Sequence, residues 1–496
     1  MISFDTVPGG AAASAVFLEE AGVRVGVGGL LIPHRIAILG QYNSGKTPTV
    51  NVPVLISSAD EAASLYGRGS MLHLMARKSF AQAPNVPIYT IPLAEAGGGT
   101  AATGSIVATS PATGAGTLAL FIGGQKVQVG IASGDTTSQL ATKIAAAINA
   151  ALDLPVTASA NTATVTLTAR HKGTFGNDIR IQRDLDSGDA AASPAGVALT
   201  LNAMSTGATN PDATTALANL GGTWYTVIAS PYQDATNIAA LEAAAALRAG
   251  SDIKRPFLAV FGYTGTKANF QSAVSARNSK FAAWVPVEDS PSIPAEVAAC
   301  AAALFGARQQ IQPGTPMRGR TLVGIRAGQA ASWTYSDEQT TVLSGGSTTR
   351  SVFDGTIVMM DFATTYKTNP LGATDETYRF ANWLGNWQTK LYSLDTVFLS
   401  APFIDAVVVD DNAVTSVEYA ISPNTVKAYA VDLVRLLWEP LALTKEADAV
   451  VAGIKTEIDS TNPGRINLLI PDVHAAGLRI IAGRVQWSFY APATAA

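Results

Sequence analysis

Strand-like and helical segments alternate three times between residues 224 and 306, and this alternation limits the fold more than any other feature of the chain. Strands are expected at residues 224–229, 257–262 and 281–287, and helices at residues 235–249, 267–278 and 294–306. Such an alternation predicts a parallel sheet with helices on its faces. Ligands often bind at the carboxyl ends of such strands. Glu288 and Asp289 lie there as a candidate acid/base pair, although adjacent carboxylates on a loop usually face solvent.

The composition predicts several domains with a weakly charged surface. The chain has 496 residues, 48 % of them hydrophobic and 14 % charged, against roughly 25 % charged in average soluble domains. Either much of the surface packs against partners or the chain is simply rich in small residues, and both readings can hold. The formal charge of −4 gives no basic surface for nucleic acid, and no apolar run reaches the ~18 residues of a membrane span. The lone Cys300 excludes a disulfide within the chain and is expected to be a buried small hydrophobe.

A self-contained α+β module interrupts the chain after Gly97-Gly98-Gly99. Its signals are a tight hairpin at Gly123-Gly124 and a helix cap at residues 135–137 that precedes apolar residues at every fourth position. The expected division is residues 1–28 as an N-terminal arm, 29–96 as the first part of the core, 97–202 as an inserted β-rich outer domain, 203–330 as an α/β domain, 331–420 as a continuation of the core, and 421–496 as a C-terminal domain and arm. The predicted fold class is multidomain α/β and α+β, with a parallel or mixed core sheet, the inserted domain and extended arms at both ends.

Residues 40–47 match the phosphate-binding P-loop pattern. That loop works because its amides face phosphate while the next helix offers its positive end. Here Pro48 and Pro53 follow within a β-branched segment, and the residue before each proline is pushed away from helical geometry. The segment should therefore be extended. A loop between strands is the favoured interpretation, and a nucleotide hydrolase remains the alternative.

The last seventy residues read as two amphipathic helices followed by two strands. The first helix begins after Ser422 and ends before Pro440, the second spans residues 444–460, and the strands are expected at residues 466–470 and 478–490. An aromatic-rich helix is expected earlier, at residues 375–395. Two strands so near a chain end need a sheet, because an isolated hairpin is marginal in water and exposes unpaired backbone groups. Either they close a sheet within this chain, or strands from other subunits complete it by β-augmentation.

Four blocks of the chain, taken in order, resemble the tail sheath proteins of contractile Mu-like phages. They are residues 1–4 with 16–19, residues 35–41 with 54–58 and 67–71, residues 103–183, and residues 431–439 with 465–470 and 477–490. No block is a catalytic signature, and the specificity lies in their order. The P-loop match at Lys46-Thr47 departs from the family pattern, and the resemblance implies that it is accidental.

The resemblance implies a structural, force-generating subunit that is not an enzyme and needs no cofactor, metal or ATP. Sheath subunits assemble into helical six-fold rings around a tail tube, together with baseplate and tail terminator proteins. They are assembled in the host cytoplasm and belong to the virion, without direct membrane insertion. Energy is stored in a metastable extended packing. When triggered, the subunits move as rigid bodies, the sheath shortens and widens, and the tube is driven through the host envelope.

The family reading assigns roles to particular residues. Strands exchanged between subunits are expected around residues 15–19 and 478–489, with contacts from Val16, Phe17, Leu18, Leu478, Ile480, Val485, Trp487 and Phe489. Lys445 and Lys455, on the polar face of the 444–460 helix, are candidates for contact with the tube, and the inserted domain should lie outermost. Three alternatives stay open: a P-loop nucleotide hydrolase at residues 40–47, a hydrolase built on the 224–306 sheet, and a tail tube or baseplate structural protein.

Overall fold

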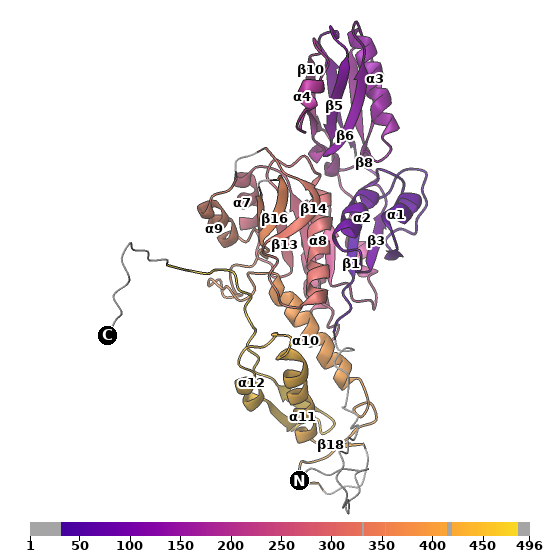
Figure 1. Ribbon diagram of the computed structural model, residues 1–496. Helices are drawn as coiled ribbons and strands as arrows, with labels where there is room; N and C mark the ends of the chain where they lie inside the picture. Colours follow the sequence, from indigo (N-terminus) through magenta and orange to yellow (C-terminus); the bar gives the residue numbers. More distant parts are fainter. Residues whose placement is uncertain (1–30, 330–331, 353, 414–418, 485–496) are drawn as a thin grey trace, which may run out of the picture. The chain divides into compact units, whose positions relative to one another are not determined.

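The fold is taken from a computed structural model that describes residues 31–329, 332–352, 354–413 and 419–484 (Figure 1). The described residues divide into two compact units. The larger unit contains Ile32–Leu391, Leu441–Glu446 and the described residues 472–484. The smaller unit consists mainly of Tyr392–Pro440 and Ala447–Pro471.

A six-stranded sheet forms the centre of the larger unit. Its order is β13 (Ala282–Pro286), β12 (Leu258–Tyr263), β11 (Val227–Ser230), β1 (Ile36–Gln41), β3 (Ile88–Leu93) and β2 (Val54–Ile56). Ile36 of β1 lies opposite Val227 on one side and Ile88 on the other, both in parallel register. Only β2 runs antiparallel, against β3. The predicted parallel or mixed core sheet is confirmed, and strands from residues 29–96 and 203–330 share it.

Helices cover the faces of this sheet. They are α1 (Ala59–Tyr66), α2 (Met71–Gln82), α5 (Thr214–Ala218), α6 (Ala235–Arg248), α7 (Lys267–Ser275) and α8 (Pro294–Ile311). The predicted helix starts at residues 235, 267 and 294 are confirmed, and Figure 1 shows α8 lying along the sheet beside α2. α8 is alanine-rich and buried along most of its length. The close approach requires Gly262 in β12, because a Cβ atom there would collide with the Pro294 carbonyl oxygen.

A second, antiparallel sheet adjoins this core. It has the order β14 (Arg320–Arg326), β16 (Thr356–Asp361) and β15 (Thr348–Ser351), and α9 (Tyr335–Leu343) precedes β15. The expected aromatic helix is α10 (Asn382–Phe398), so the predicted start at residue 375 was wrong. The Asp375 carboxylate accepts hydrogen bonds from the Thr377 amide at 2.9 Å and the Tyr366 hydroxyl at 2.6 Å, and Phe380 bridges to Ala363. These contacts hold the chain in turns and extended geometry.

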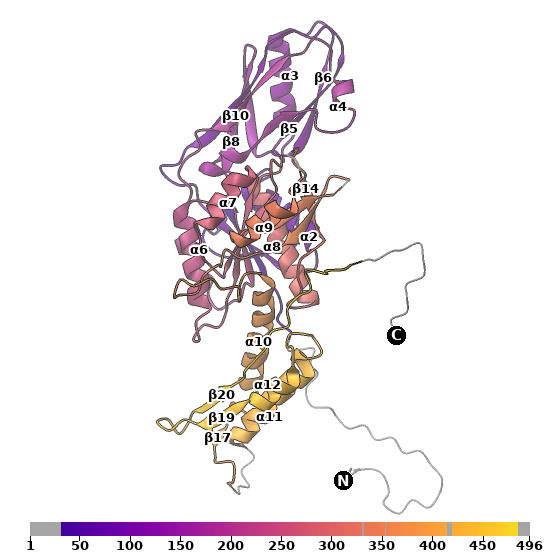
Figure 2. The ribbon, with the colours of Figure 1, turned by 90° about the vertical axis from the view of Figure 1, so that its left-hand side faces the viewer.

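The inserted module contains two sheets, a long helix and a short one (Figure 2). The first sheet has the strand order β10 (Leu199–Ser205), β4 (Ala101–Ala108), β8 (Thr164–Lys172) and β7 (Val156–Asn161). The second sheet has the order β6 (Gln125–Ile131), β5 (Gly116–Ile122) and β9 (Ile181–Arg183). The helices are α3 (Thr137–Ala150) and the short α4 (Asp189–Ala192). The predicted cap is confirmed, since Thr136 and Gln139 form a reciprocal capping box. Gly123 and Gly124 make the tight β5–β6 turn with positive φ.

The smaller unit holds two short sheets packed with helices. Its strands are β17 (Val407–Val408), β18 (Ala420–Ile421), β19 (Lys455–Ile458) and β20 (Ile466–Leu469), and its helices are α11 (Pro423–Leu433), continued by a π-helical turn over Val434–Trp438, and α12 (Ala447–Gly453). The Ser422 cap is confirmed by its side-chain hydrogen bond from the Thr425 amide. The predicted helix at residues 444–460 was wrong beyond Gly453, because the chain leaves α12 and pairs with β20.

Candidate assembly interface

The β19–β20 hairpin is a two-stranded sheet with both outer edges open among the described residues. Lys455 lies opposite Leu469, and Ile458 lies opposite Ile466. Helix α11 contacts both strands, and Figure 2 shows this helix beside the hairpin. Such an edge presents a row of unpaired N–H and C=O groups and is a template for another strand. The hairpin is therefore the best candidate for assembly in the smaller unit.

The turn of this hairpin is held rigidly by one carboxylate. Asp459 accepts hydrogen bonds from the Thr461 amide at 2.9 Å, the Thr461 hydroxyl at 2.7 Å and the Asn462 amide at 3.0 Å. These bonds, with the Thr461 side chain first, hold the pKa of Asp459 well below its ordinary value. The Asp459 carboxylate is therefore ionised at neutral pH. The turn that it stabilises fixes the register of β19 against β20.

The register assigns the backbone groups that face outward. The Asp459 amide donates to the Arg465 carbonyl at 2.8 Å, so these two residues form a hydrogen-bonded pair. Because such pairs alternate along an antiparallel ladder, the Glu457 amide points to β20 and the Thr456 amide points away. On β20 the outward position is that of Leu468, the partner of Thr456.

The described part of the C-terminal segment is extended and exposed. Leu478 and Ile480, both predicted to lie in an exchanged strand, have 69 % and 70 % of their surface exposed, and no strand is assigned between residues 471 and 484. Exposure of branched apolar side chains next to a chain end is typical of an interaction segment. We define residues 472–479 as the C-terminal strap.

Six of the predicted exchange residues cannot be placed. Val16, Phe17, Leu18, Val485, Trp487 and Phe489 lie outside the described residues. Both lysine candidates are placed and exposed. Lys445 lies 3.8 Å from Glu446, and Lys455 begins β19, so the two do not share the face of one helix as predicted.

The P-loop-like segment lacks the geometry of a phosphate site. β1 ends at Gln41, and no helix begins before α1 at Ala59. The Lys46 ammonium, which would meet the phosphates in a P-loop, donates to the Ser64 carbonyl at 2.7 Å. With no helix N-terminus behind the loop, its amides have no added positive field for an anion. The segment is not helical, as Pro48 and Pro53 predicted, but the expectation of a fully extended chain was wrong, because it turns at Val50 and Asn51 (φ 60°) before β2 begins at Val54.

The carboxylates after β13 are used as structural acceptors. Glu288 accepts from the Lys267 amide at 2.7 Å and from the Trp333 indole at 2.5 Å, while Asp289 pairs with Arg180. These contacts tie α7, the 332–333 segment and the inserted module to the end of the strand. The arrangement explains the pair without assigning it acid/base chemistry.

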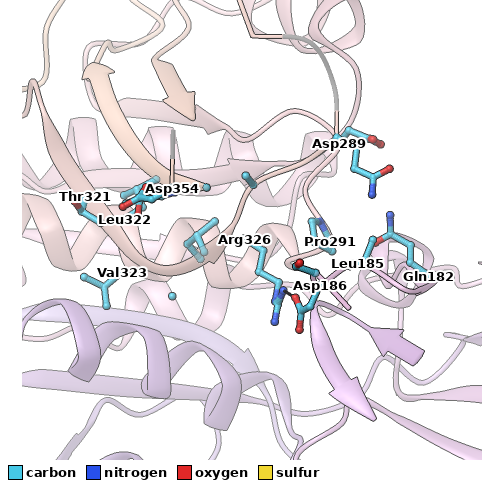
Figure 3. A pocket seen from close by; sticks show the side chains of 17 residues that line it. Gln182, Leu185, Asp186, Asp289, Pro291, Thr321, Leu322, Val323, Arg326 and Asp354 are labelled. Carbon is cyan, nitrogen blue, oxygen red and sulfur yellow. Dashed lines mark hydrogen bonds and ion pairs between the residues drawn. The ribbon is translucent and has the colours of Figure 1, made fainter. Parts of the chain in front are cut away.

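A cavity of about 790 Å³ lies near Asp289, and Figure 3 shows its lining from β14 and the segment after β9. Asp186 in this lining accepts a hydrogen bond from Arg326 at 2.7 Å and one from Lys126 at 3.1 Å. The bond from Arg326 lowers the pKa of Asp186. An ionised, doubly paired carboxylate is unsuited to donate a proton, so Asp186 does not serve as an acid in this cavity.

The histidines and acids of the described ranges do not gather into a metal centre. No group of three or more His, Cys, Asp or Glu within these ranges could hold a metal ion. His171 is fully buried with its Nδ1 2.8 Å from Glu95, and Cys300 is buried in α8. None of the helices in the described ranges is long and apolar enough to cross a membrane.

Sequence reasoning missed β19, although a signal was present. Residues 455–458 read Lys-Thr-Glu-Ile, a short alternation next to the turn residues Asp459-Ser460-Thr461-Asn462-Pro463-Gly464. Two alternating segments around such a turn indicate a hairpin. The apolar residues Val450, Val451, Ile454 and Ile458 keep a helical spacing across the end of α12, and this continuity concealed the change of period.

Comparisons with known proteins identify one extended relative. No family model matches the chain. A curated protein described as the Mu-like prophage FluMu tail sheath protein of Haemophilus influenzae is 27 % identical over 487 residues, which cover 98 % of this chain and 99 % of that protein. Among solved structures, the sheath tail protein of Desulfitobacterium hafniense aligns over 93 % of this chain and 100 % of its own, with 11 % identity and a TM-score of 0.48. The sheath tail protein Lin1278 of Listeria innocua covers 89 % and 92 %, with 9 % identity and a TM-score of 0.48.

Proposed function

We propose that this chain is the structural subunit of a contractile tail sheath, and that it assembles in helical six-fold rings around a tail tube. The observation that carries the proposal is its near full-length similarity to a Mu-like prophage tail sheath protein. The subunit is part of the tail of a virion and is assembled in the host cytoplasm. It contacts the tube, the baseplate and the tail terminator, and it contracts to drive the tube through the host envelope.

The hairpin supports a specific mode of assembly. β19 and β20 have two open edges, and a pair of strands alone is marginally stable. An N-terminal strand around Val16–Leu18 from one neighbour and a C-terminal strand around Leu478–Phe489 from another would pair with these edges. Main-chain hydrogen bonds would supply affinity, and the alternating apolar side chains would fix the register.

No catalytic step is needed in this mechanism. Energy is stored in the metastable extended lattice, so the subunit acts without nucleotide, metal or other cofactor and is not an enzyme. The use of Lys46, Glu288 and Asp289 as structural hydrogen-bonding groups supports this assignment. We further propose that residues 97–202 lie on the outside of the sheath, and that Lys445 and Lys455 belong to the surface toward the tube.

Removal of residues 1–20 should separate folding from assembly. The full-length chain is expected to form wide helical cylinders in negative-stain images. The truncated chain should remain folded by circular dichroism but form no cylinders, because one edge of each hairpin stays unpaired. Cylinders of normal abundance from the truncated chain would reject strand exchange. Narrow tubes or discs from the full-length chain would instead support a tube or baseplate protein.

A further inference from the structure

The C-terminal strap is fixed to the larger unit at its start. The Asp472 carboxylate receives hydrogen bonds from the buried Lys390 ammonium at 2.5 Å and from the Thr444 hydroxyl at 2.7 Å. A backbone bridge joins Thr444 to His474, and the Ala475 amide donates to the Leu443 carbonyl at 3.2 Å. The buried charge of Lys390 is compensated by Asp472, so this first anchor is costly to break.

The strap then passes very close to the core. A Cβ atom on Gly477 would lie 2.7 Å from the Pro316 Cδ atom, closer than two such carbons can approach. The backbone of the strap is therefore in direct contact with the surface before β14. The contact holds the segment between its two ends.

A second anchor closes the strap at Arg479. The guanidinium lies 3.4 Å from the centroid of the Phe380 ring, and its Nε donates to Asp361 Oδ1 at 3.0 Å. Its Nη2 lies 2.9 Å from the same oxygen and completes the ion pair. Arg318 donates to the Arg479 carbonyl. A planar cation that stacks on an aromatic ring while it also donates a hydrogen bond to a carboxylate is a geometry that arginine provides and glutamine does not. We name this group, made of Arg479, Asp361 and Phe380, the Arg479 clamp.

The clamp also orients the residues on either side. Only 28 % of the Arg479 side chain is exposed, whereas its neighbours Leu478 and Ile480 are mostly exposed. In an extended backbone, successive side chains point in opposite directions. Burying Arg479 therefore turns Leu478 and Ile480 away from the larger unit.

We propose that the Arg479 clamp fixes the point at which the C-terminal arm leaves its own subunit and thereby sets the reach of that arm toward a second copy of this chain. This inference rests on the proposed sheath function. Without the clamp, residue 479 is held only by the solvent-exposed hydrogen bond from Arg318 to its carbonyl. Once that bond opens, the next hydrogen-bonded anchor is the Ala475 backbone bond, and residues 476–479 become free chain. Four extended residues add roughly 13–14 Å of slack to the arm. This length is almost three times the distance between neighbouring strands in a sheet. An arm that is longer by this amount would transmit less force between subunits, because it must first be pulled taut.

The test uses the full-length chain with a spin label at Ala476, an exposed position between the two anchors. The lone Cys300 is fully buried and should not react, so Ala476→Cys provides one labelling site. In unassembled subunits, Arg479→Gln should raise the mobility of the label at least threefold. Arg484→Gln is the matched control. This variant also removes one positive charge, five residues further along the chain. The Arg484 side chain is exposed and forms no ion pair with the described residues, so the mobility of the label should not change.

The yield of cylinders measures assembly, separately from the label mobility that reports on the clamp. Arg479→Gln should reduce the yield of cylinders at least fivefold while the melting temperature of the unassembled chain stays within the range of the control. An unchanged label mobility in Arg479→Gln would show that the clamp does not hold the strap. A mobile label with a normal yield of cylinders would show that the clamp does not set the link. If the parent chain forms no cylinders at all, the proposed function and the reach argument both fail, while the mobility still decides whether the clamp exists.

Discussion

His34 places an ionisable base in the apolar centre of the larger unit. Its Nδ1 lies 2.9 Å from the Thr226 hydroxyl oxygen, its ring meets the Phe305 ring edge-on, and its Nε2 has no hydrogen-bond partner among the described residues. Burial lowers the pKa of His34 to about 3. His34 lies two residues before β1, and its protonated ring would be an unpaired buried charge there.

This histidine should make folding sensitive to mild acid. The unfolded chain binds a proton at His34 below its ordinary pKa of about 6.5, whereas the folded chain does not until pH falls to about 3. Stability from this group is therefore fully present above about pH 6.5 and declines by about 1.4 kcal/mol for each pH unit below it. Urea denaturation of the unassembled chain at pH 7 and pH 5.5 measures the effect.

His34→Asn supplies the comparison, because its amide can reach the Thr226 hydroxyl but does not titrate in this range. The variant should lose about 1 kcal/mol less stability than the parent between the two pH values. An equal loss in both chains would show that His34 is not the group responsible.

At the scale of elements, the outward amides of the β19–β20 hairpin allow a sharp test of augmentation. Proline removes an N–H and is tolerated in an edge strand where that N–H does not pair within the sheet. Thr456→Pro and Leu468→Pro should leave the β19–β20 ladder intact but block a partner strand at either edge. Each should reduce cylinder formation at least tenfold, with the alanine variants at the same positions assembling normally.

Circular dichroism and the melting temperature of the unassembled chain must accompany this assay, because proline also restricts φ. Loss of assembly in a folded proline variant supports edge pairing. Proline variants that assemble as well as the alanine variants would contradict it.

The elements that the sequence predicted well are those whose signals are local. The alternation over residues 224–306 located β11–β13 and the starts of their helices, and Thr136 and Ser422 marked their helix caps. The start of α10 was missed because the 375–381 segment is held by Asp375 and by the bridge from Phe380 to Ala363, which are tertiary contacts. The pairing of β1 with β11 joins residues almost two hundred positions apart, and no periodicity encodes it.

In the candidate interface too, the features with a local sequence signal were predicted and those that depend on tertiary contacts were not. The exposed apolar pattern at Leu478 and Ile480 is visible in the sequence, whereas the partner surface of Arg479 is formed by Asp361 and Phe380, far away in the chain. Lys455 was assigned to the polar face of a helix over residues 444–460, because the apolar residues on either side of it keep a helical spacing. Its position in β19 depends on pairing with Leu469.

At the scale of the whole molecule, the proposed lattice accounts for both the low charge and the open strand edges. Only 14 % of the residues are charged, and the smaller unit carries a hairpin without a third strand in the described part of the chain. Isolated proteins usually protect such edges with charge, proline or a covering segment. A subunit that assembles with its own copies, as proposed for this chain, can leave these edges free, because neighbouring subunits complete them.

The most direct test is a reconstruction of the assembled protein by electron cryo-microscopy, read at the β19–β20 hairpin. The account predicts a helical cylinder of six-subunit rings in which strands from the N-terminal and C-terminal arms of neighbouring copies lie against the two edges of each hairpin. A cylinder in which every hairpin remains two-stranded, with both arms folded onto their own subunit, would contradict it.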